Sequence, residues 1–405
     1  MAEAALQDPS PAPTPTLGRA RRALVKRLAD VVCLPSSRVN AFERAMTADL
    51  LVEMLREGEP DDRVRTARRL IGLTEIPTSI LRLLLRDEIV IASPLLEDGT
   101  VIPDSELILC AHQTTIEHRR LIAARREVSE LVVDAIIDAE ESDVVELLLR
   151  NAGARFSATA IERIVAASRD HPRYVAGLLR RSELRPSHAY VMFWWSDPEA
   201  RRTILQRFAV SREILQDASG DIFPLATAEG WQDPLVRKAL QFIERRQRNR
   251  AALDKSPFQS LDEAVAAAED GMTRDLASEI AYLSGIKPTT GAKIFTDAYG
   301  EPLAILCKAT GLPRSAVKVL WRGLRRPEAD SAGRPAAALE RSLITYDMMA
   351  VDRAQTVLRY WNWSLSSALT PALVRAIREG DEDAIDEYSA PQRAAMLALS
   401  SDFKG

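Results

Sequence analysis

Hydrophobic residues recur along most of the chain at spacings of three and four, in short stretches separated by turn residues. This spacing places apolar side chains on one face of an α-helix. Three stretches, 95–104, 148–157 and 178–187, share one layout: a Leu-Leu pair ends an apolar segment, a turn follows, and Ser or Asp stands where the next helix begins. Ser and Asp cap helix N-termini by accepting backbone hydrogen bonds. The pattern therefore predicts a succession of short helices.

A second recurrence indicates how these helices stack. Residues 62–70 and 87–95 carry Asp, Val or Ile, Ala and Leu at matching places, and Asp62 and Asp87 are 25 residues apart. Asp in the first turn is favoured by the helix dipole, and the small Ala allows neighbouring helices to approach closely. Repetition over 20 to 50 residues is typical of helical solenoids. We expect a HEAT-like solenoid that continues in helix pairs, broken at Asp104, Ser157, 171–172, 186 and 197–198.

A different repeat occupies residues 261–325. The segments around Gly285 and Gly311 are alike and 26 residues apart. A Pro-, Gly- and Ala-rich stretch follows, and the remaining chain is predicted to form one helix from Ala336 to about Tyr360, a break near residues 361–363 and another helix that begins at Thr370.

The predicted fold class is all-α: a HEAT-like helical-repeat solenoid followed by a compact helical module and C-terminal helices. The expected organisation is a disordered tail over 1–17, a solenoid over 18–250 that opens with a basic amphipathic helix, a helical module over 258–325, a linker over 326–335 and a C-terminal helical segment over 336–405.

Composition narrows the classes of function. The 405 residues include 54 Lys and Arg against 58 Asp and Glu, a formal net charge of −4. This balance disfavours binding of nucleic acid or anionic membrane by the whole chain, although a local patch could still bind. The three cysteines are far apart, which argues against a disulfide framework. The sequence has neither a signal-peptide pattern nor an apolar run of about 18 residues. We therefore expect no membrane span and a cytoplasmic location.

Three phrases together resemble one protein family. They are Asp-x-Ile-x-x-Ala-x-x-Leu-Leu at 87–96, Leu-Leu-Arg-Asn-x-x-Ala-x-x-Ser at 148–157, and Leu-x-x-Leu-Cys-Lys-Ala-Thr-Gly-Leu-Pro at 303–313. In this order they resemble the alphaproteobacterial family known as domain of unknown function 2336, over roughly residues 40–330. The resemblance implies a soluble helical bacterial protein, and it brings no catalytic residues.

An acidic run provides the first candidate site. Its carboxylates step by three and four residues from Glu127 to Glu141, so we expect them on one helix face, with apolar Leu131 on the other. Like charges at this spacing repel one another, which calls for a compensating charge. That charge comes either from a basic protein partner or from Arg119 and its neighbouring arginines, unless solvent alone screens the run. The candidate partner-binding residues are Glu130, Asp134, Asp138 and Glu141.

Aromatic and basic residues form the second candidate. Trp194 and Trp195 could line a concave groove together with Arg201 and Arg202. HEAT-like solenoids that resemble bacterial alkylpurine glycosylases hold damaged DNA with such side chains. The alternative is that the aromatic rings are buried between repeats.

The segment 303–322 resembles a helix-turn-helix, with Gly311 in the turn. Its second helix carries the candidate nucleic-acid residues Arg314, Ser315, Lys318 and Arg322. Tight helix pairs also occur in proteins that never touch DNA. In that case we expect Ala316, Val317 and Leu320 to be buried and the basic residues to face solvent or acidic neighbours.

No other pattern indicates catalysis or a cofactor. Cys110, His112 and His118 have zinc-binding donor types, but their spacing matches no compact zinc module. Neither a nucleophile–base pattern nor a phosphate-binding glycine loop is present. We therefore expect no metal and no cofactor. The predicted function is a non-catalytic protein–protein interaction scaffold or regulator. A DNA-associated regulator that uses residues 303–322 is the alternative, and a repeat-type DNA glycosylase is the third.

Overall fold

The protein was examined as a computed structural model, which describes residues 15–35, 37–73, 75–99, 102–209 and 256–367. By its contacts the chain divides into two compact units, Met1–Ala160 and Ile161–Gly405. Within the described residues, helices predominate and no strand is present, only two isolated β-bridges. The all-α prediction is therefore confirmed. The HEAT-like solenoid and the domain boundaries remain predictions, and most of the predicted 1–17 tail lies outside the described residues.

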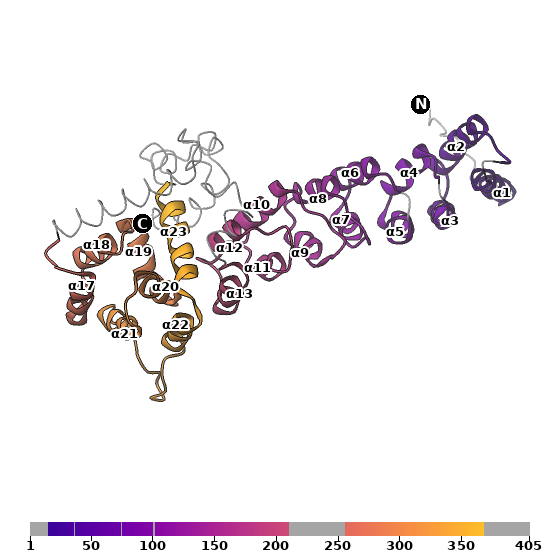
Figure 1. Ribbon diagram of the computed structural model, residues 1–405. Helices are drawn as coiled ribbons and strands as arrows, with labels where there is room; N and C mark the ends of the chain where they lie inside the picture. Colours follow the sequence, from indigo (N-terminus) through magenta and orange to yellow (C-terminus); the bar gives the residue numbers. More distant parts are fainter. Residues whose placement is uncertain (1–14, 36, 74, 100–101, 210–255, 368–405) are drawn as a thin grey trace, which may run out of the picture. The chain divides into compact units, whose positions relative to one another are not determined.

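In the first unit, helices pack in two rows. α3 contacts α5, α5 contacts α7 and α7 contacts α9, while α2, α4, α6 and α8 form the corresponding second series. Figure 1 shows the two rows. The helices are α1 (Pro15–Val32), α2 (Ala41–Arg56), α3 (Pro60–Leu70), α4 (Thr78–Leu85), α5 (Ile89–Asp98), α6 (Asp104–Gln113), α7 (Ile116–Ala123), α8 (Glu130–Ile137) and α9 (Ser142–Arg150), followed by α10 (Ala158–Ala167), which crosses the division.

Polar contacts between successive helix pairs accompany this packing. The Cys110 thiol donates to the Leu85 carbonyl oxygen at 3.2 Å, and the Asn151 amide donates to the Ala123 carbonyl oxygen at 2.8 Å. These contacts join residues 25 and 28 positions apart. They satisfy backbone carbonyls at helix ends, which would otherwise be costly to bury.

The acidic run does not form one helix face, so that prediction was wrong. Glu127 precedes α8, Asp138 follows its last residue, and Glu141 stands immediately before α9. In the turn between α8 and α9, Glu140 adopts the left-handed conformation, with φ 55°. Leu131, expected on the buried side, is 65% exposed. A turn therefore separates carboxylates whose spacing suggested a continuous stripe.

In the second unit, α20 is surrounded by other helices. It contacts α19, α21, α22 and α23, and every residue from Glu301 to Cys307 is buried. A helix that is buried on all sides is typically apolar all round, as most of this one is. The remaining elements of this unit are α11 (Arg173–Leu178), α12 (Pro186–Met192), α13 (Pro198–Phe208), α17 (Leu261–Ala267), η1 (Ala268–Asp270), α18 (Arg274–Leu283), α19 (Pro288–Thr296), α20 (Glu301–Thr310), α21 (Arg314–Gly323), α22 (Ala337–Met348) and α23 (Val351–Ser367).

Gly285 and Gly311 lie in two successive helix pairs. α18 and α19 form the first pair, and α20 and α21 form the second. Gly285 and Gly311 occupy equivalent turns with φ values of 73° and 82°. Glycine adopts this left-handed conformation without the steric penalty that a Cβ imposes.

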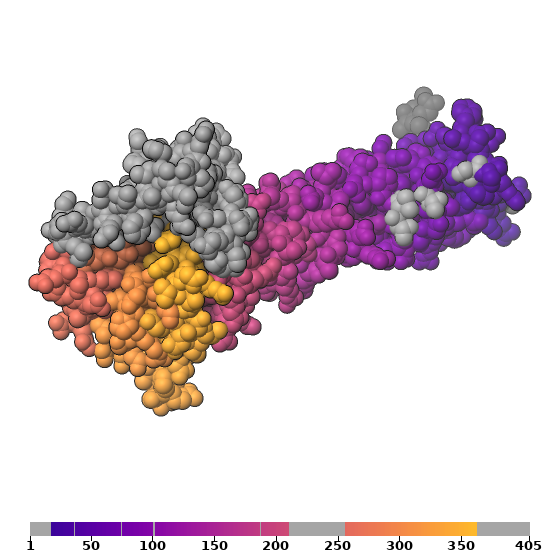
Figure 2. Space-filling view, in the orientation of Figure 1, coloured from indigo at the N-terminus to yellow at the C-terminus, as the bar shows by residue number. Residues whose placement is uncertain are grey.

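The C-terminal helices differ from the prediction. The single helix expected to reach Tyr360 is interrupted at Met349, whose backbone is extended, and α23 then runs without a break through residues 361–363. Ala354, Val357 and Trp361 recur at helical spacing and are buried, so the tryptophan continues the buried stripe instead of ending it. The helix expected from Thr370 lies outside the described residues. The predicted linker forms an exposed loop that projects beyond α21 and α22 (Figures 1 and 2).

Candidate functional site

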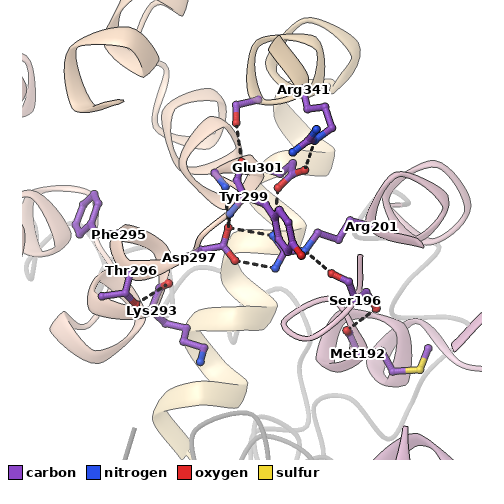
Figure 3. Close-up of polar contacts among 12 residues, drawn as sticks. Met192, Ser196, Arg201, Lys293, Phe295, Thr296, Asp297, Tyr299, Glu301 and Arg341 are labelled. Carbon is purple, nitrogen blue, oxygen red and sulfur yellow. Dashed lines mark hydrogen bonds and ion pairs between the residues drawn. The ribbon is translucent and has the colours of Figure 1, made fainter. Parts of the chain in front are cut away.

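A buried ion-pair network links α13 to the start of α20. The Arg201 guanidinium binds both carboxylate oxygens of Asp297, at 2.7 and 3.0 Å, and one oxygen of Glu301 at 3.1 Å. Its Nε donates to the Ser196 carbonyl oxygen at 3.1 Å. Arg341 of α22 lies 3.6 Å from the other Glu301 oxygen. Figure 3 shows these side chains converging between the three helices. Such bidentate, charge-assisted bonds fix geometry as well as contributing energy.

Local backbone structure explains why these groups meet. Asp197 caps α13 through the Ala200 N–H, and Pro198 occupies its first turn, so Arg201 projects from the following turn. Asp297 accepts hydrogen bonds from the backbone N–H groups of Tyr299 and Gly300, at 3.1 and 2.8 Å. These bonds hold its carboxylate toward the guanidinium before α20 begins.

The network is almost closed to solvent. The side chains of Arg201, Asp297 and Glu301 are 2%, 5% and 4% exposed. The aromatic rings of Phe193 and Tyr299 lie 4.5 and 4.7 Å from the guanidinium carbon. Rings at such distances are attracted to a guanidinium cation. Arg201 was expected on a partner-binding surface, but its burial assigns it a structural role.

The tryptophans of the same candidate set are partly exposed and contact other side chains of this unit. The Trp194 ring lies 4.8 Å from that of Trp361, and the Trp195 indole N–H donates to the Ser168 hydroxyl at 3.0 Å. Trp361 in turn packs on Phe193, which is fully buried. The packing alternative stated above therefore describes these residues better than an aromatic groove does.

Arg202, the fourth member of that set, is exposed and borders a pocket. The pocket has a volume of about 530 Å³ and lies between α13 and α22, with Glu301 and Arg341 of the ion-pair network among its lining residues. α13 contributes positions 198, 199, 202, 205 and 206, with Ala209 directly after its end, and α22 contributes 341, 344, 345 and 348, so each helix presents one face. Met349 and Arg353 complete the lining. The pocket is therefore a groove between two helical faces.

Apolar and cationic groups share this pocket. Ile344 and Met348 are 43% and 61% exposed, and they lie one turn apart on α22. Arg202 and Arg353 have no hydrogen-bond or ion-pair partner among the described residues, and the same holds for the Glu199 side chain. The lining thus combines an exposed aliphatic wall with two arginines that have no counter-charge within hydrogen-bonding range.

Sequence reasoning missed most of this pocket. It singled out Arg202 but not Arg341, Arg353, Ile344 or Met348. One signal was present: α22 carries a buried apolar row, Leu339 and Leu343, and a second apolar row beside it. A surface helix that is apolar on more than one face usually has more than one packing partner.

The acidic candidates are partly neutralised within the first unit. Arg119 donates to Glu141 at 2.6 Å, and this hydrogen bond raises the pKa of the guanidinium. Asp134 accepts a hydrogen bond from the Ser157 hydroxyl at 2.9 Å. Glu130 and Asp138 lie at opposite ends of α8. The arginine alternative therefore accounts for Glu141.

The basic residues of the helix-turn-helix candidate have acidic neighbours. Arg314 binds Asp347 of α22 at 3.0 Å, and Arg322 binds Glu269 at 2.6 Å. Lys318 and Ser315 are exposed. As expected for a structural helix pair, the remaining positions Ala316, Val317 and Leu320 are buried.

The candidate zinc donors do not converge. Cys110 donates to a carbonyl, His112 is exposed, and the His118 Nε2 lies 3.0 Å from the Asp87 carbonyl oxygen. No group of three or more His, Cys, Asp or Glu suited to a metal ion occurs among the described residues. Burial raises the pKa of the Cys307 thiol to about 12, which keeps it protonated and poorly nucleophilic. Within the described part of the chain, no helix is long and apolar enough to cross a membrane.

Comparison with known proteins places the chain in a family. No curated protein and no solved structure matches it. A family profile described as "Uncharacterised protein conserved in bacteria (DUF2336)" matches residues 91–359. The matched range contains the ion-pair network and the whole α13–α22 pocket. Since the match covers more than half of the 405 residues, the chain belongs to this bacterial family, the one that its three phrases resemble.

Proposed function

We propose that the protein is a non-catalytic cytoplasmic adaptor or regulator that binds a protein partner through the α13–α22 pocket. The observation that carries this proposal is the exposed aliphatic wall of Ile344 and Met348 beside the unpaired arginines Arg202 and Arg353. Exposed apolar patches rimmed by polar groups mark interaction sites, and Met and Arg are enriched at protein interfaces. Methionine also adapts its shape to a partner at little cost.

Rigid support below the pocket favours the same function. Glu301 lies in the pocket lining, and its two oxygens are bound by Arg201 and Arg341. Buried ion pairs of this kind hold their helices in register, because breaking one leaves an uncompensated charge. A groove whose walls are fixed before binding loses less entropy when a partner docks.

The two alternative functions have weaker support. DNA binding would need Arg314 and Arg322 to exchange their acidic neighbours for phosphates, and glycosylase chemistry would need an open aromatic groove where Trp194 and Trp195 are packed. The contacts of these residues favour neither arrangement, whereas the exposed side chains of the α13–α22 pocket favour binding of a protein partner.

Site-specific photocrosslinking tests the proposal. A photoreactive amino acid replaces Met348 in the full chain, expressed in the native host, and a matched control carries it at Tyr282, which is 50% exposed on α18 and outside the pocket lining. We expect one host protein to crosslink from position 348 and not from 282, and to form an equimolar complex when both proteins are purified. Equal crosslinking from both positions, or failure to reconstitute the complex, would contradict the proposal.

A further inference from the structure

The α13–α22 pocket also indicates what kind of partner it fits. On the basis of the proposed function, we propose that the partner inserts an acidic amphipathic helix into this pocket. Its carboxylates bind Arg202 and Arg353, and its aliphatic side chains pack against Ile344 and Met348.

The helical shape of the occupant follows from the walls. Positions 202, 205 and 206 of α13 follow the spacing i, i+3, i+4, and Ala209 lies directly after the end of that helix. Positions 341, 344, 345 and 348 of α22 follow the spacing i, i+3, i+4, i+7. Two such rows that line one pocket form a groove of the sort that receives the apolar face of an amphipathic helix. The volume of about 530 Å³ accommodates a few side chains of such a helix, not a whole domain.

The acidic character of the occupant follows from the charges. Of the arginines in the lining, Arg341 lies beside Glu301, whereas Arg202 and Arg353 lack an acidic partner among the described residues. Glu301 accepts a hydrogen bond from Arg201 at 3.1 Å and lies 3.6 Å from Arg341, so two guanidinium groups balance its negative charge. Glu199 is the one lining carboxylate outside this network.

A basic or neutral occupant fits less well. It would leave two guanidinium groups to be desolvated without a counter-charge, which costs more than the apolar contacts nearby return. Carboxylates instead form charge-assisted and often bidentate bonds with arginine. The occupant also needs apolar side chains, because Leu205, Ile344 and Met348 have no polar group that could bind a charge.

Peptide binding to the full-length protein tests this assignment. The probe is a labelled synthetic helix of about 18 residues with Leu on one face and Glu on the other. One matched peptide has Gln in place of Glu, and another has Lys. We expect the Glu peptide to bind about tenfold more tightly than the Gln peptide, and the Lys peptide more weakly still.

A charge reversal then locates the binding. The double variant R202E/R353E should bind the Glu peptide about tenfold more weakly and should bind the Lys peptide better than the wild type does. The control R274E/K318E makes the same change in net charge at exposed positions of this unit outside the pocket lining, and it should leave both affinities unchanged.

Three outcomes would overturn the assignment. The first is that the Glu peptide fails to bind or is indifferent to R202E/R353E. The second is that it binds only after the carboxylates between Glu379 and Glu387 are neutralised, which would assign the pocket to the chain's own acidic stretch. The third is that the partner crosslinked from position 348 binds R202E/R353E as well as the wild type. The third outcome leaves the adaptor function intact, whereas the absence of any such partner would remove the adaptor function itself.

Discussion

The Arg201 guanidinium and the Asp297 carboxylate form two parallel hydrogen bonds across 96 residues of sequence, and both side chains are at most 5% exposed. Asp297→Asn should therefore lower the free energy of unfolding by about 3–5 kcal/mol, because it leaves the buried arginine without its closest counter-charge. Urea denaturation provides the measurement.

A surface pair serves as the control for this variant. Arg314 and Asp347 are also 3.0 Å apart, but their side chains are 48% and 51% exposed. Asp347→Asn should cost at most about 1 kcal/mol, since solvent screens the pair. If the two variants lower the free energy of unfolding equally, the buried Arg201 network does not stabilise the fold more than the exposed pair does.

Gly300 allows α20 to start next to the network. Its φ is 89°, and an added Cβ would lie 2.4 Å from Trp321 Cζ3 and 2.8 Å from Ser342 Oγ. Gly300→Ala should destabilise the protein by about 2–4 kcal/mol, through backbone strain together with overpacking. Gly311 separates backbone strain from overpacking, because its φ is 82° but no atom lies within 4 Å of an added Cβ. Gly311→Ala should therefore cost about 1 kcal/mol, from strain alone. Similar thermal shifts for both variants would refute the packing contribution at Gly300.

Glu141 should contribute to stability rather than to binding. Its partner Arg119 is 12% exposed and also donates to the carbonyl oxygens of Ala111 and Thr114, at 2.8 and 2.7 Å. Glu141→Gln removes the charge that balances this largely buried guanidinium and should cost about 1–3 kcal/mol. Glu140→Gln is the neighbouring control and should change the melting temperature little, because that side chain is exposed. A Glu141 variant as stable as the wild type would return this carboxylate to the candidate binding surface.

The basic residues of α21 should be dispensable for folding. Replacing Arg314, Lys318 and Arg322 with Ala removes only exposed pairs worth about 0–1 kcal/mol each, so melting should shift by a few degrees at most. Duplex DNA should bind neither protein with a salt-sensitive, sub-micromolar affinity. Such binding by the wild type, lost in the triple variant, would favour the DNA-associated regulator, because each lost phosphate contact lowers the salt slope by roughly one.

The sequence was most predictive where local chemistry decides the structure. The turn glycines Gly285 and Gly311 and the helix starts at Asp104, Pro186 and Pro198 were all identifiable, since capping residues, proline and glycine act on their immediate neighbours. The buried positions of α21 followed from its period in the same way.

Long-range and atypical features were not predictable. Asp297 shares no periodic relationship with Arg201, so nothing in the sequence paired them. The turn after α8 contains Glu140 in the left-handed conformation, and neither Gly nor Pro lies between Glu127 and Glu141 to signal that turn. Neither Gly nor Pro signals the interruption of the helix at Met349 either. The α13–α22 pocket depends on two helices, one ending at Phe208 and the other beginning at Ala337, which only the fold brings together.

Calorimetric titration of the purified partner, the one crosslinked from position 348, tests the adaptor function most directly. Met348→Asp places a carboxylate on the exposed aliphatic wall, while Tyr282→Asp makes the same type of change at a comparably exposed site elsewhere on the unit. Met348→Asp should weaken partner binding by at least about tenfold, because it removes apolar contact area and places a carboxylate in the same pocket as Arg202 and Arg353, where it competes with the carboxylates of the partner. Tyr282→Asp should leave partner binding unchanged. Equal affinities for the wild type and Met348→Asp would contradict the assignment of the α13–α22 pocket as the binding site.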